Sequence, residues 1–228
     1  MTIHLKIDFV SDVSCPWCVI GLKALEQALD NVAPAIAAEI RFQPFELNPQ
    51  MVPEGQEINE HLRQKYGSSP EQLAQTREHI RQRGAELGFE FGPGKRSRVY
   101  NTFDTHRLLH WAGLQDEAAG GGRQRALKHA LFTSYFTDGQ NPGSHEVMLA
   151  AAKAVGLDEV QAREVLESGR YAMQVRKQQQ FYQSQGIHSV PAIIIDDRHL
   201  ISGGQPPGVF EQALRQIAAR KEETAAAT

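Results

Sequence analysis

The chain contains 228 residues, 41% of them hydrophobic, and a chain of this length can bury about 70% of its unfolded surface without disulfides or metals. Lys and Arg number 24 against 27 Asp and Glu, so the net charge of -3 leaves no basic surplus for a nucleic-acid partner. No segment approaches the roughly 18 consecutive apolar residues of a membrane span, and residues 1–6 alternate instead of forming a signal peptide, so we expect a cytoplasmic protein that does not enter membranes.

The first elements form a β-α-β unit. Residues 3–9 alternate apolar and polar side chains, which predicts a strand, and residues 22–32 place apolar side chains at helical spacing. Pro16 suits the first turn of that helix, where its missing N–H needs no partner. A second strand is expected over residues 40–47. Cys15 therefore lies at the amino end of a helix that follows a strand.

Cys15 and Cys18 are the only cysteines, which excludes a disulfide-rich scaffold. A structural zinc site usually needs four ligands, so the pair would have to recruit two of the nine histidines. Two buried cysteines that act as small hydrophobic side chains are another option. The β-α-β context favours a third interpretation, a redox dithiol in a Cys-Pro-Trp-Cys motif.

The position of Cys15 bears on its reactivity, because the thiolate is the form that attacks a disulfide. A helix dipole contributes about 0.3–1 kcal/mol, less than one pKa unit, so a larger fall in pKa needs N–H groups that hydrogen bond to the sulfur. We predict that Cys15 is an exposed nucleophile with a low pKa and that Cys18 is the resolving thiol on the same helix face. Trp17 either forms an apolar wall for substrate or packs as an ordinary core residue.

The carboxyl end predicts a β-β-α unit. Residues 192–195 are a short apolar run typical of a buried strand, and a turn leads to a second strand over residues 199–201. Pro206 and Pro207 then open a last helix with apolar residues at helical spacing.

The middle of the chain has a different character. Residues 51–185 contain no convincing strand and are too long for a loop, which predicts an all-helical insertion. Ser69 begins a capping box with proline at the first helical position. We expect residues 1–50 and 186–228 to form one discontinuous domain around this insertion.

These features resemble a known family. The β-α-β unit with Cys-Pro-Trp-Cys, followed much later by Val190-Pro191 before a β-β-α unit, resembles the thioredoxin superfamily. Within it, the chain is similar to the FrnE-like cytoplasmic branch of the DsbA family, which is related to 2-hydroxychromene-2-carboxylate isomerase and the kappa-class glutathione transferases. The similarity covers nearly the whole chain, and the motifs that carry it are Asp12-x-x-Cys15-Pro16-Trp17-Cys18, Asn101-Thr102 with His106-Arg107-Leu108, and Gly203-Gly204-Gln205.

The resemblance implies an α/β thioredoxin fold, with a mixed central sheet and a large all-helical insertion. It also implies a cis peptide bond between Val190 and Pro191 opposite the cysteines, whereas the alternative for Pro191 is an ordinary loop proline. A cis loop would leave backbone groups of Val190 free to bind an extended substrate segment. Asn101 and His106 either face the cleft or are polar residues of a helix surface, and Asp12 either relays a proton or caps the first helix.

The leading hypothesis is a thiol-disulfide oxidoreductase in which Cys15 attacks a substrate disulfide and Cys18 resolves the mixed disulfide. We expect no metal or cofactor beyond the redox-active disulfide, with glutathione as a candidate co-substrate. The partners would be a disulfide-containing protein or small thiol and, since there is no third cysteine, an external electron donor or acceptor; monomer and homodimer both remain options. The alternatives are a glutathione-dependent isomerase or transferase, whose relatives usually carry serine in place of Cys15, and a redox-controlled or metal-binding module.

Overall fold

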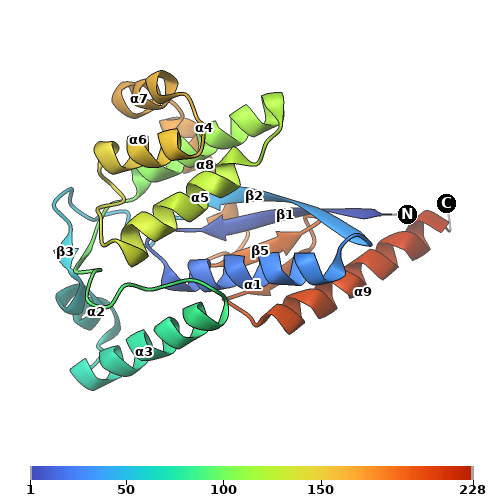
Figure 1. Cartoon of the computed structure of the whole chain (residues 1–228), viewed down its shortest axis with the longest axis horizontal. Helices are drawn as coiled ribbons and strands as arrows, with labels where there is room; N and C mark the ends of the chain where they lie inside the picture. The colour runs from blue at the N-terminus through green and yellow to red at the C-terminus, as the bar shows by residue number, and fades with distance from the viewer. Residues whose placement is uncertain (1, 227–228) are drawn as a thin grey trace.

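A computed structural model describes residues 2–226 and has a mixed four-stranded sheet at its centre (Figure 1). The strand order is β2-β1-β5-β6. Strand β1 (Ile3–Ser11) pairs in parallel with β2 (Ile36–Pro44). On its other side β1 pairs with the antiparallel β5 (Ala192–Ile195), which pairs in turn with β6 (His199–Ser202). The sheet therefore joins the first and last parts of the chain.

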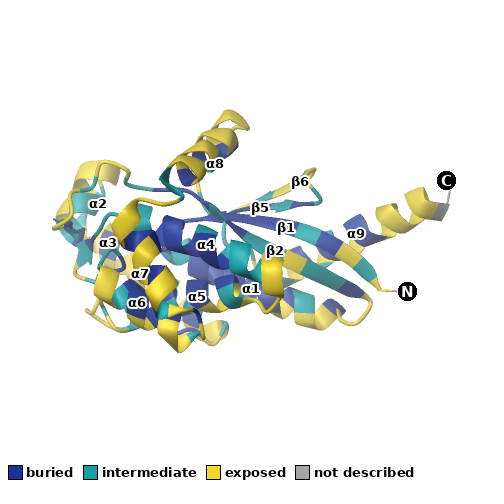
Figure 2. Cartoon of the chain, turned by 90° about the horizontal axis from the view of Figure 1, so that it is seen from above, coloured by how far each residue is buried: buried dark blue, intermediate teal, exposed yellow. Residues whose placement is uncertain are grey.

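The helices cover the sheet on both sides. Helices α1 and α9 pack against each other on one side of the sheet, and α8 lies on the opposite side (Figure 2). Helices α4 to α7 gather beyond β2, above the sheet in Figure 1. The helices are α1 (Pro16–Val32), α2 (Ile58–Tyr66), α3 (Pro70–Glu86), α4 (Phe103–Ala119), α5 (Arg123–Phe132), the π-helix η1 (Thr133–Thr137), α6 (His145–Ala154), α7 (Glu159–Ser168), α8 (Ala172–Ser184) and α9 (Pro207–Ala226).

This arrangement is the expected α/β thioredoxin fold, β1-α1-β2 and β5-β6-α9, interrupted by helices. One detail of the expectation is wrong, because the insertion is not all-helical: β3 (Gln56–Glu57) and β4 (Arg98–Val99) pair antiparallel. Strands of two residues are too short to show the alternation that predicts a strand. Strand β2 also starts at Ile36, before the expected residue 40, because all of its nine residues pair with β1.

Two local sequence signals are confirmed. Pro16 occupies the first turn of α1, directly after Cys15 at the N-cap. Ser69 caps α3 by accepting a hydrogen bond from the Gln72 N–H, while the Gln72 side chain accepts one from the Ser69 N–H. Both signals involve residues a few positions apart, so they do not depend on the tertiary fold.

One hydrophobic core runs from the sheet into the inserted helices (Figure 2). Phe9 of β1, Leu108 of α4 and Phe210 of α9 all belong to it and have no exposed surface. The segments before, within and after the insertion therefore share apolar packing.

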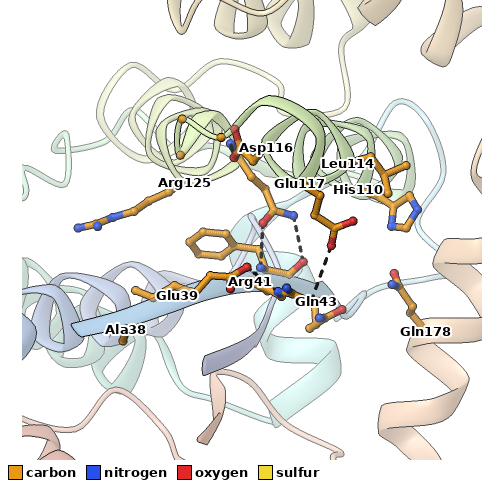
Figure 3. A pocket seen from close by; sticks show the side chains of 17 residues that line it. Ala38, Glu39, Arg41, Gln43, His110, Leu114, Asp116, Glu117, Arg125 and Gln178 are labelled. Atoms are coloured by element: carbon orange, nitrogen blue, oxygen red, sulfur yellow. Dashed lines mark hydrogen bonds and ion pairs between the residues drawn. The ribbon is translucent and has the colours of Figure 1, made fainter. Parts of the chain in front are cut away.

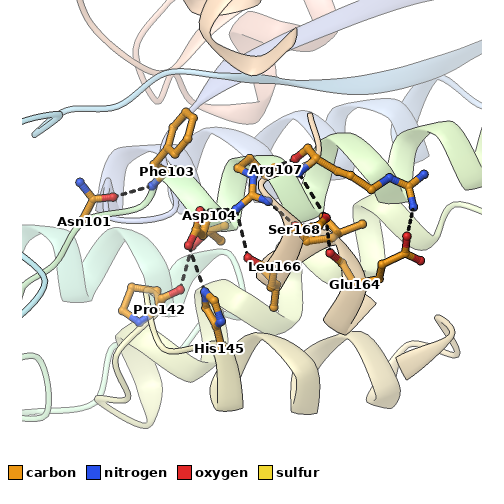
Figure 4. Close-up of polar contacts among 12 residues, drawn as sticks. Asn101, Phe103, Asp104, Arg107, Pro142, His145, Glu164, Leu166 and Ser168 are labelled. Carbon is orange, nitrogen blue, oxygen red and sulfur yellow. Dashed lines mark hydrogen bonds and ion pairs between the residues drawn. The ribbon is translucent and has the colours of Figure 1, made fainter. Parts of the chain in front are cut away.

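A buried arginine ties two inserted helices together (Figure 4). Arg107 of α4 is 3% exposed, and its guanidinium donates to the carbonyl oxygens of Val165, of Leu166 (3.4 Å) and of Arg170 (2.8 Å) around the end of α7. It also pairs with Asp104 at 2.6 Å. The last carbonyls of a helix lack partners within the helix, so they can solvate a buried cation.

A second polar cluster joins α1, which carries the cysteines, to α5. Glu26 of α1 is buried, and its carboxylate accepts a 2.6 Å hydrogen bond from Arg125 Nε. His129 Nε2 lies 2.6 Å from the same oxygen.

Within residues 2–226, no helix is both long and apolar enough to cross a membrane.

Candidate active site around Cys15 and Cys18

The cysteines lie where β1 ends and α1 begins. Cys15 is the N-cap residue of α1, with extended backbone angles, and no side chain caps the helix there. The Cys15 N–H donates to the Asp12 carbonyl (3.2 Å), and the Cys18 N–H donates to the Cys15 carbonyl (3.1 Å). The first turn of α1 thus holds the two residues of the motif close together, and both are free thiols.

The loop before β5 lies opposite Cys15. The peptide bond between Val190 and Pro191 is cis, and the Cys15 thiol lies 3.6 Å from the Val190 carbonyl oxygen. A Cβ added to Gly21 would lie 3.0 Å from Pro191 Cγ, and one added to Gly204 would lie 3.0 Å from the Trp17 carbonyl oxygen. The two glycines therefore allow the Pro191 loop and the turn after β6 to approach α1 closely.

Both sulfurs are covered, which corrects the expectation of an exposed nucleophile. Cys15 is 4% exposed and Cys18 is fully buried. A helix amino terminus is often open to solvent, but here residues distant in sequence cover it. One of them is Val190, whose carbonyl oxygen lies 3.6 Å from the Cys15 thiol.

The two thiols differ in pKa. A hydrogen bond from the Cys18 side chain lowers the pKa of Cys15, with help from the N–H groups of Cys18 and Trp17, although burial and the charge of Asp12 act the other way. Burial raises the pKa of Cys18 well above its usual value, and the proximity of Cys15 adds to that rise. The pair therefore favours a thiolate at Cys15 and a protonated thiol at Cys18.

Asp12 holds the loop before the cysteines instead of capping α1. Its carboxylate is fully buried and accepts hydrogen bonds from the N–H groups of Ser14 (3.0 Å) and Leu47 (2.7 Å). Burial alone would raise its pKa, but His106 and these two N–H groups lower the pKa to about 2. Asp12 is therefore ionised near neutral pH.

His106 is buried, and Asn101 is half-buried. His106 is 3% exposed, and its Nε2 lies 3.7 Å from an Asp12 carboxylate oxygen without a hydrogen-bond partner among the described residues. Asn101 accepts from the Phe103 N–H at 2.9 Å, as Figure 4 shows, and donates to the Met51 carbonyl at 3.2 Å. His106 therefore lies behind the loop that carries the cysteines, and Asn101 orders the start of α4.

Trp17 is partly buried against the core and flanks the site. Its ring centroid lies 5.6 Å from that of His79 on α3. Both interpretations of Trp17 thus have a structural basis, since it packs on the core and also borders the cysteines.

Comparison with known proteins agrees with this geometry. Residues 6–215 match the DSBA-like thioredoxin domain. The chain belongs to the DsbA-like thioredoxin family. The structure is similar to that of the probable DsbA oxidoreductase SCO1869 of Streptomyces coelicolor, with 32% identity, a TM-score of 0.84 and coverage of 93% of this chain and 89% of that one.

Two further relatives extend the comparison. Protein YwbO of Bacillus subtilis, described as uncharacterized, is 27% identical over 216 residues, which are 94% of this DsbA-like chain and 96% of YwbO. The fold also resembles the cytosolic disulfide reductase DsbM of Pseudomonas aeruginosa, solved with glutathione, at 19% identity and a TM-score of 0.62. That similarity covers 92% of this chain and 98% of DsbM.

Sequence reasoning missed one charged residue near the dithiol of this DsbA-like protein. Lys128 of α5 is 1% exposed, and its ammonium nitrogen lies 5.0 Å and 5.9 Å from the ring centroids of Phe132 and Phe42. Burial lowers its pKa to about 8, while the negative charges of Asp12 and Cys15 act against that shift. The available signal was periodicity, because Lys128 follows Leu127 on the inner face of the helix.

Two cavities differ in whether they lie next to the dithiol. A cavity of about 490 Å³ between β2 and the helices α4 and α5 has neither cysteine in its wall, and Arg41 and Glu117 form an ion pair across part of it (Figure 3). A cleft of about 560 Å³ includes Pro16, the neighbour of Cys15. Within residues 2–226, no group of three or more His, Cys, Asp or Glu side chains is arranged to hold a metal ion.

Proposed function

We propose that this protein is a thiol-disulfide oxidoreductase in which Cys15 is the nucleophile and Cys18 the resolving thiol. The observation that carries the proposal is the position of the Cys15 thiol at the N-cap of α1, 3.6 Å from the Val190 carbonyl oxygen that precedes the cis Pro191. The lowered pKa of Cys15 and the raised pKa of Cys18 agree with it. One sulfur is prepared to attack, and the other stays protonated until it is needed.

In the reductive direction, the Cys15 thiolate attacks one sulfur of the substrate disulfide, and the other substrate sulfur leaves as a thiolate. The Cys15 charge is consumed in this step, so an influence that raises the pKa of Cys18 is removed. Cys18 then loses its proton and attacks the Cys15 sulfur, which releases the second substrate sulfur. Two electrons pass to the substrate, and a disulfide between Cys15 and Cys18 remains.

The reverse sequence oxidises a substrate dithiol, and either direction needs an external thiol or disulfide to restore the pair. Glutathione is our candidate for this co-substrate, because the DsbM structure contains it in the same fold. The description of DsbM as cytosolic also supports a cytoplasmic location. We further propose that residues 1–50 and 186–228 form the domain that does the chemistry and that 51–185 control access to it.

We place the substrate disulfide beside the Val190–Pro191 loop. The Val190 carbonyl already faces Cys15 at 3.6 Å, so the loop backbone is close enough to align an extended segment with the sulfur. Pro16, Trp17 and Pro191 would form the apolar border of this position. None of them carries a group that competes with the thiolate.

The test uses single cysteine variants in an insulin-reduction assay with glutathione or dithiothreitol as the donor. Cys15→Ser should abolish activity, because no mixed disulfide can form. Cys18→Ser should accumulate the mixed disulfide at Cys15, which mass spectrometry of the unreduced protein detects. Full activity in both variants would contradict the proposal and would favour the glutathione-dependent isomerase alternative.

A further inference from the structure

The cleft that includes Pro16 runs between α3 and the segment 91–97. Its volume of about 560 Å³ has room for several side chains. Part of its wall is apolar, formed by Ile58, Ala74, Ile80, Phe91, Pro93 and Phe136. Since Pro16 adjoins Cys15, a chain segment in this cleft would begin beside the nucleophile.

The charged side chains along the cleft include more arginines than glutamates. Glu57 caps α2, and its carboxylate accepts a 2.8 Å hydrogen bond from the Glu60 N–H. Glu78 forms an ion pair with Arg81 through two contacts of 2.6 and 2.8 Å. Arg77 instead donates to a neutral acceptor, the side-chain oxygen of Asn59. The cleft thus presents a cation that has no carboxylate partner among the described residues.

Arg96 is a second such cation. Its guanidinium donates to the Tyr135 hydroxyl (2.8 Å) and to the Ser14 carbonyl (3.1 Å), and it lies 5.1 Å from the centroid of the Phe136 ring. All of these partners are neutral. Because Ser14 directly precedes Cys15, Arg96 connects the cleft with the loop that carries the nucleophile.

Helix α3 forms one wall and is only lightly attached to the core. Of its 17 residues, only Leu73 and Gly84 are buried. Ile80 points its apolar side chain at the cleft and is half-buried rather than packed in the core. Ile80 and the exposed Ala74 are the apolar side chains that α3 offers to a chain in the cleft.

We propose that this cleft binds the polypeptide segment next to the substrate cystine and selects segments that combine an apolar side chain with a carboxylate. The apolar side chain lies among Ile58, Ile80 and Phe91, and the carboxylate pairs with Arg77 and Arg96. This inference rests on the proposed function, because it takes Cys15 as the atom that the substrate reaches.

Binding is measured by calorimetry on the Cys15→Ser protein, so that no thiol exchange takes place. The probes are blocked peptides with serine in place of cysteine, flanked by Leu and Glu, by Leu and Lys, or by Ser and Glu. We expect the Leu-Glu peptide to bind about fivefold more tightly than the Leu-Lys peptide, as for exposed ion pairs. Its advantage over the Ser-Glu peptide should be about tenfold, because one leucine side chain is buried.

Charge reversal identifies the cleft as the site. Arg77→Glu should invert the preference between the Glu and Lys peptides. Arg163→Glu is the matched control, since Arg163 is an exposed arginine of α7 that pairs with Glu159. Equal affinities for the Leu-Glu and Leu-Lys peptides, an unchanged preference in Arg77→Glu, or no benefit from leucine would each overturn the inference.

A parallel reaction separates this inference from the proposed function. Wild-type protein is given 2-hydroxyethyl disulfide, a small neutral substrate that does not need the cleft. Reduction of this compound without peptide selectivity would leave the oxidoreductase standing and remove the cleft proposal. Selective peptide binding without reaction toward any disulfide would do the opposite.

Discussion

At the scale of single residues, Lys128 shows how the site combines stability with chemistry. Its ammonium lies between aromatic rings, and no carboxylate lies within ion-pair distance of it among the described residues. A buried cation without a counterion is costly, as the fall of its pKa from 10.5 to about 8 indicates. Its positive charge also opposes the rise in the pKa of Cys18. The charge that destabilises the fold therefore also helps Cys18 to ionise, which the resolving step requires.

Replacement of Lys128 by methionine should slow resolution and stabilise the fold. Without the ammonium the pKa of Cys18 rises further, so less thiolate is available to attack the mixed disulfide. At pH 7 the variant should be more stable by up to about 3 kcal/mol, because both states of the wild-type lysine are protonated there and the desolvation cost is fully present. Urea unfolding of the reduced proteins measures the stability, and thiol release from a preformed mixed disulfide measures the rate.

The pH dependence provides a check on the Lys128 assignment. As the pH rises from about 8 to 10.5, the folded lysine loses its proton before the unfolded one does, so the wild type should approach the variant in stability. A constant difference over this range would show that the lysine is not the source of the gap.

The charge of Asp12 raises the pKa of Cys15, whereas the charge of Lys128 lowers the pKa of Cys18. Asp12→Asn should therefore lower the pKa of Cys15, which the ultraviolet absorbance of the thiolate measures. Because the pKa of Asp12 falls from 3.8 to about 2 on folding, its contribution of about 2 kcal/mol is present above pH 3.8 and lost as the pH falls toward 2. The variant should lack this acid-side decline. An unchanged thiolate pKa would contradict the electrostatic link.

At the scale of elements, the close approach of the Pro191 loop to α1 can be tested through a glycine pair. A Cβ at Gly21 would meet Pro191 Cγ at 3.0 Å, whereas one at Gly208 in α9 would meet nothing within 4 Å. Both positions gain helix propensity from alanine. Gly21→Ala should nevertheless be less stable than Gly208→Ala by about 1–3 kcal/mol, because it overpacks the contact.

Chemical denaturation of the two glycine variants gives the stability difference, and the insulin assay shows whether the shifted loop slows attack. We expect Gly21→Ala to be slower and Gly208→Ala to match the wild type. Equal stability and equal activity of both variants would mean that the Pro191 loop moves freely away from α1.

The distance along the chain between interacting residues decides what could be predicted from the sequence. Pro16 and Ser69 act on residues within one turn, so their roles followed from short patterns, and the apolar periodicity identified the β-α-β and β-β-α units. Cys15 is covered by Val190 of the loop before β5, and Asp12 lies beside His106 of α4. These contacts join distant parts of the chain. No local pattern encodes them.

At the scale of the whole molecule, the insertion and the thioredoxin-like part share one core. Glu26 on α1 binds Arg125 and His129 on α5, and the apolar core continues across the same boundary. Shared packing of this kind couples the two parts, so that neither loses its structure without exposing apolar surface of the other. The inserted helices should therefore not unfold separately from the sheet.

The two tryptophans test this coupling, because Trp17 lies beside the dithiol and Trp111 lies in α4 of the insertion. In Trp111→Phe the fluorescence reports on the thioredoxin-like part, and in Trp17→Phe it reports on the inserted helices. Each variant has its own stability, so its fluorescence midpoint is compared with the midpoint of its own far-ultraviolet circular dichroism. We expect the two midpoints to coincide in both variants, because one core unfolds as a unit. A fluorescence transition that precedes the circular dichroism transition in Trp17→Phe would mean that the insertion opens alone.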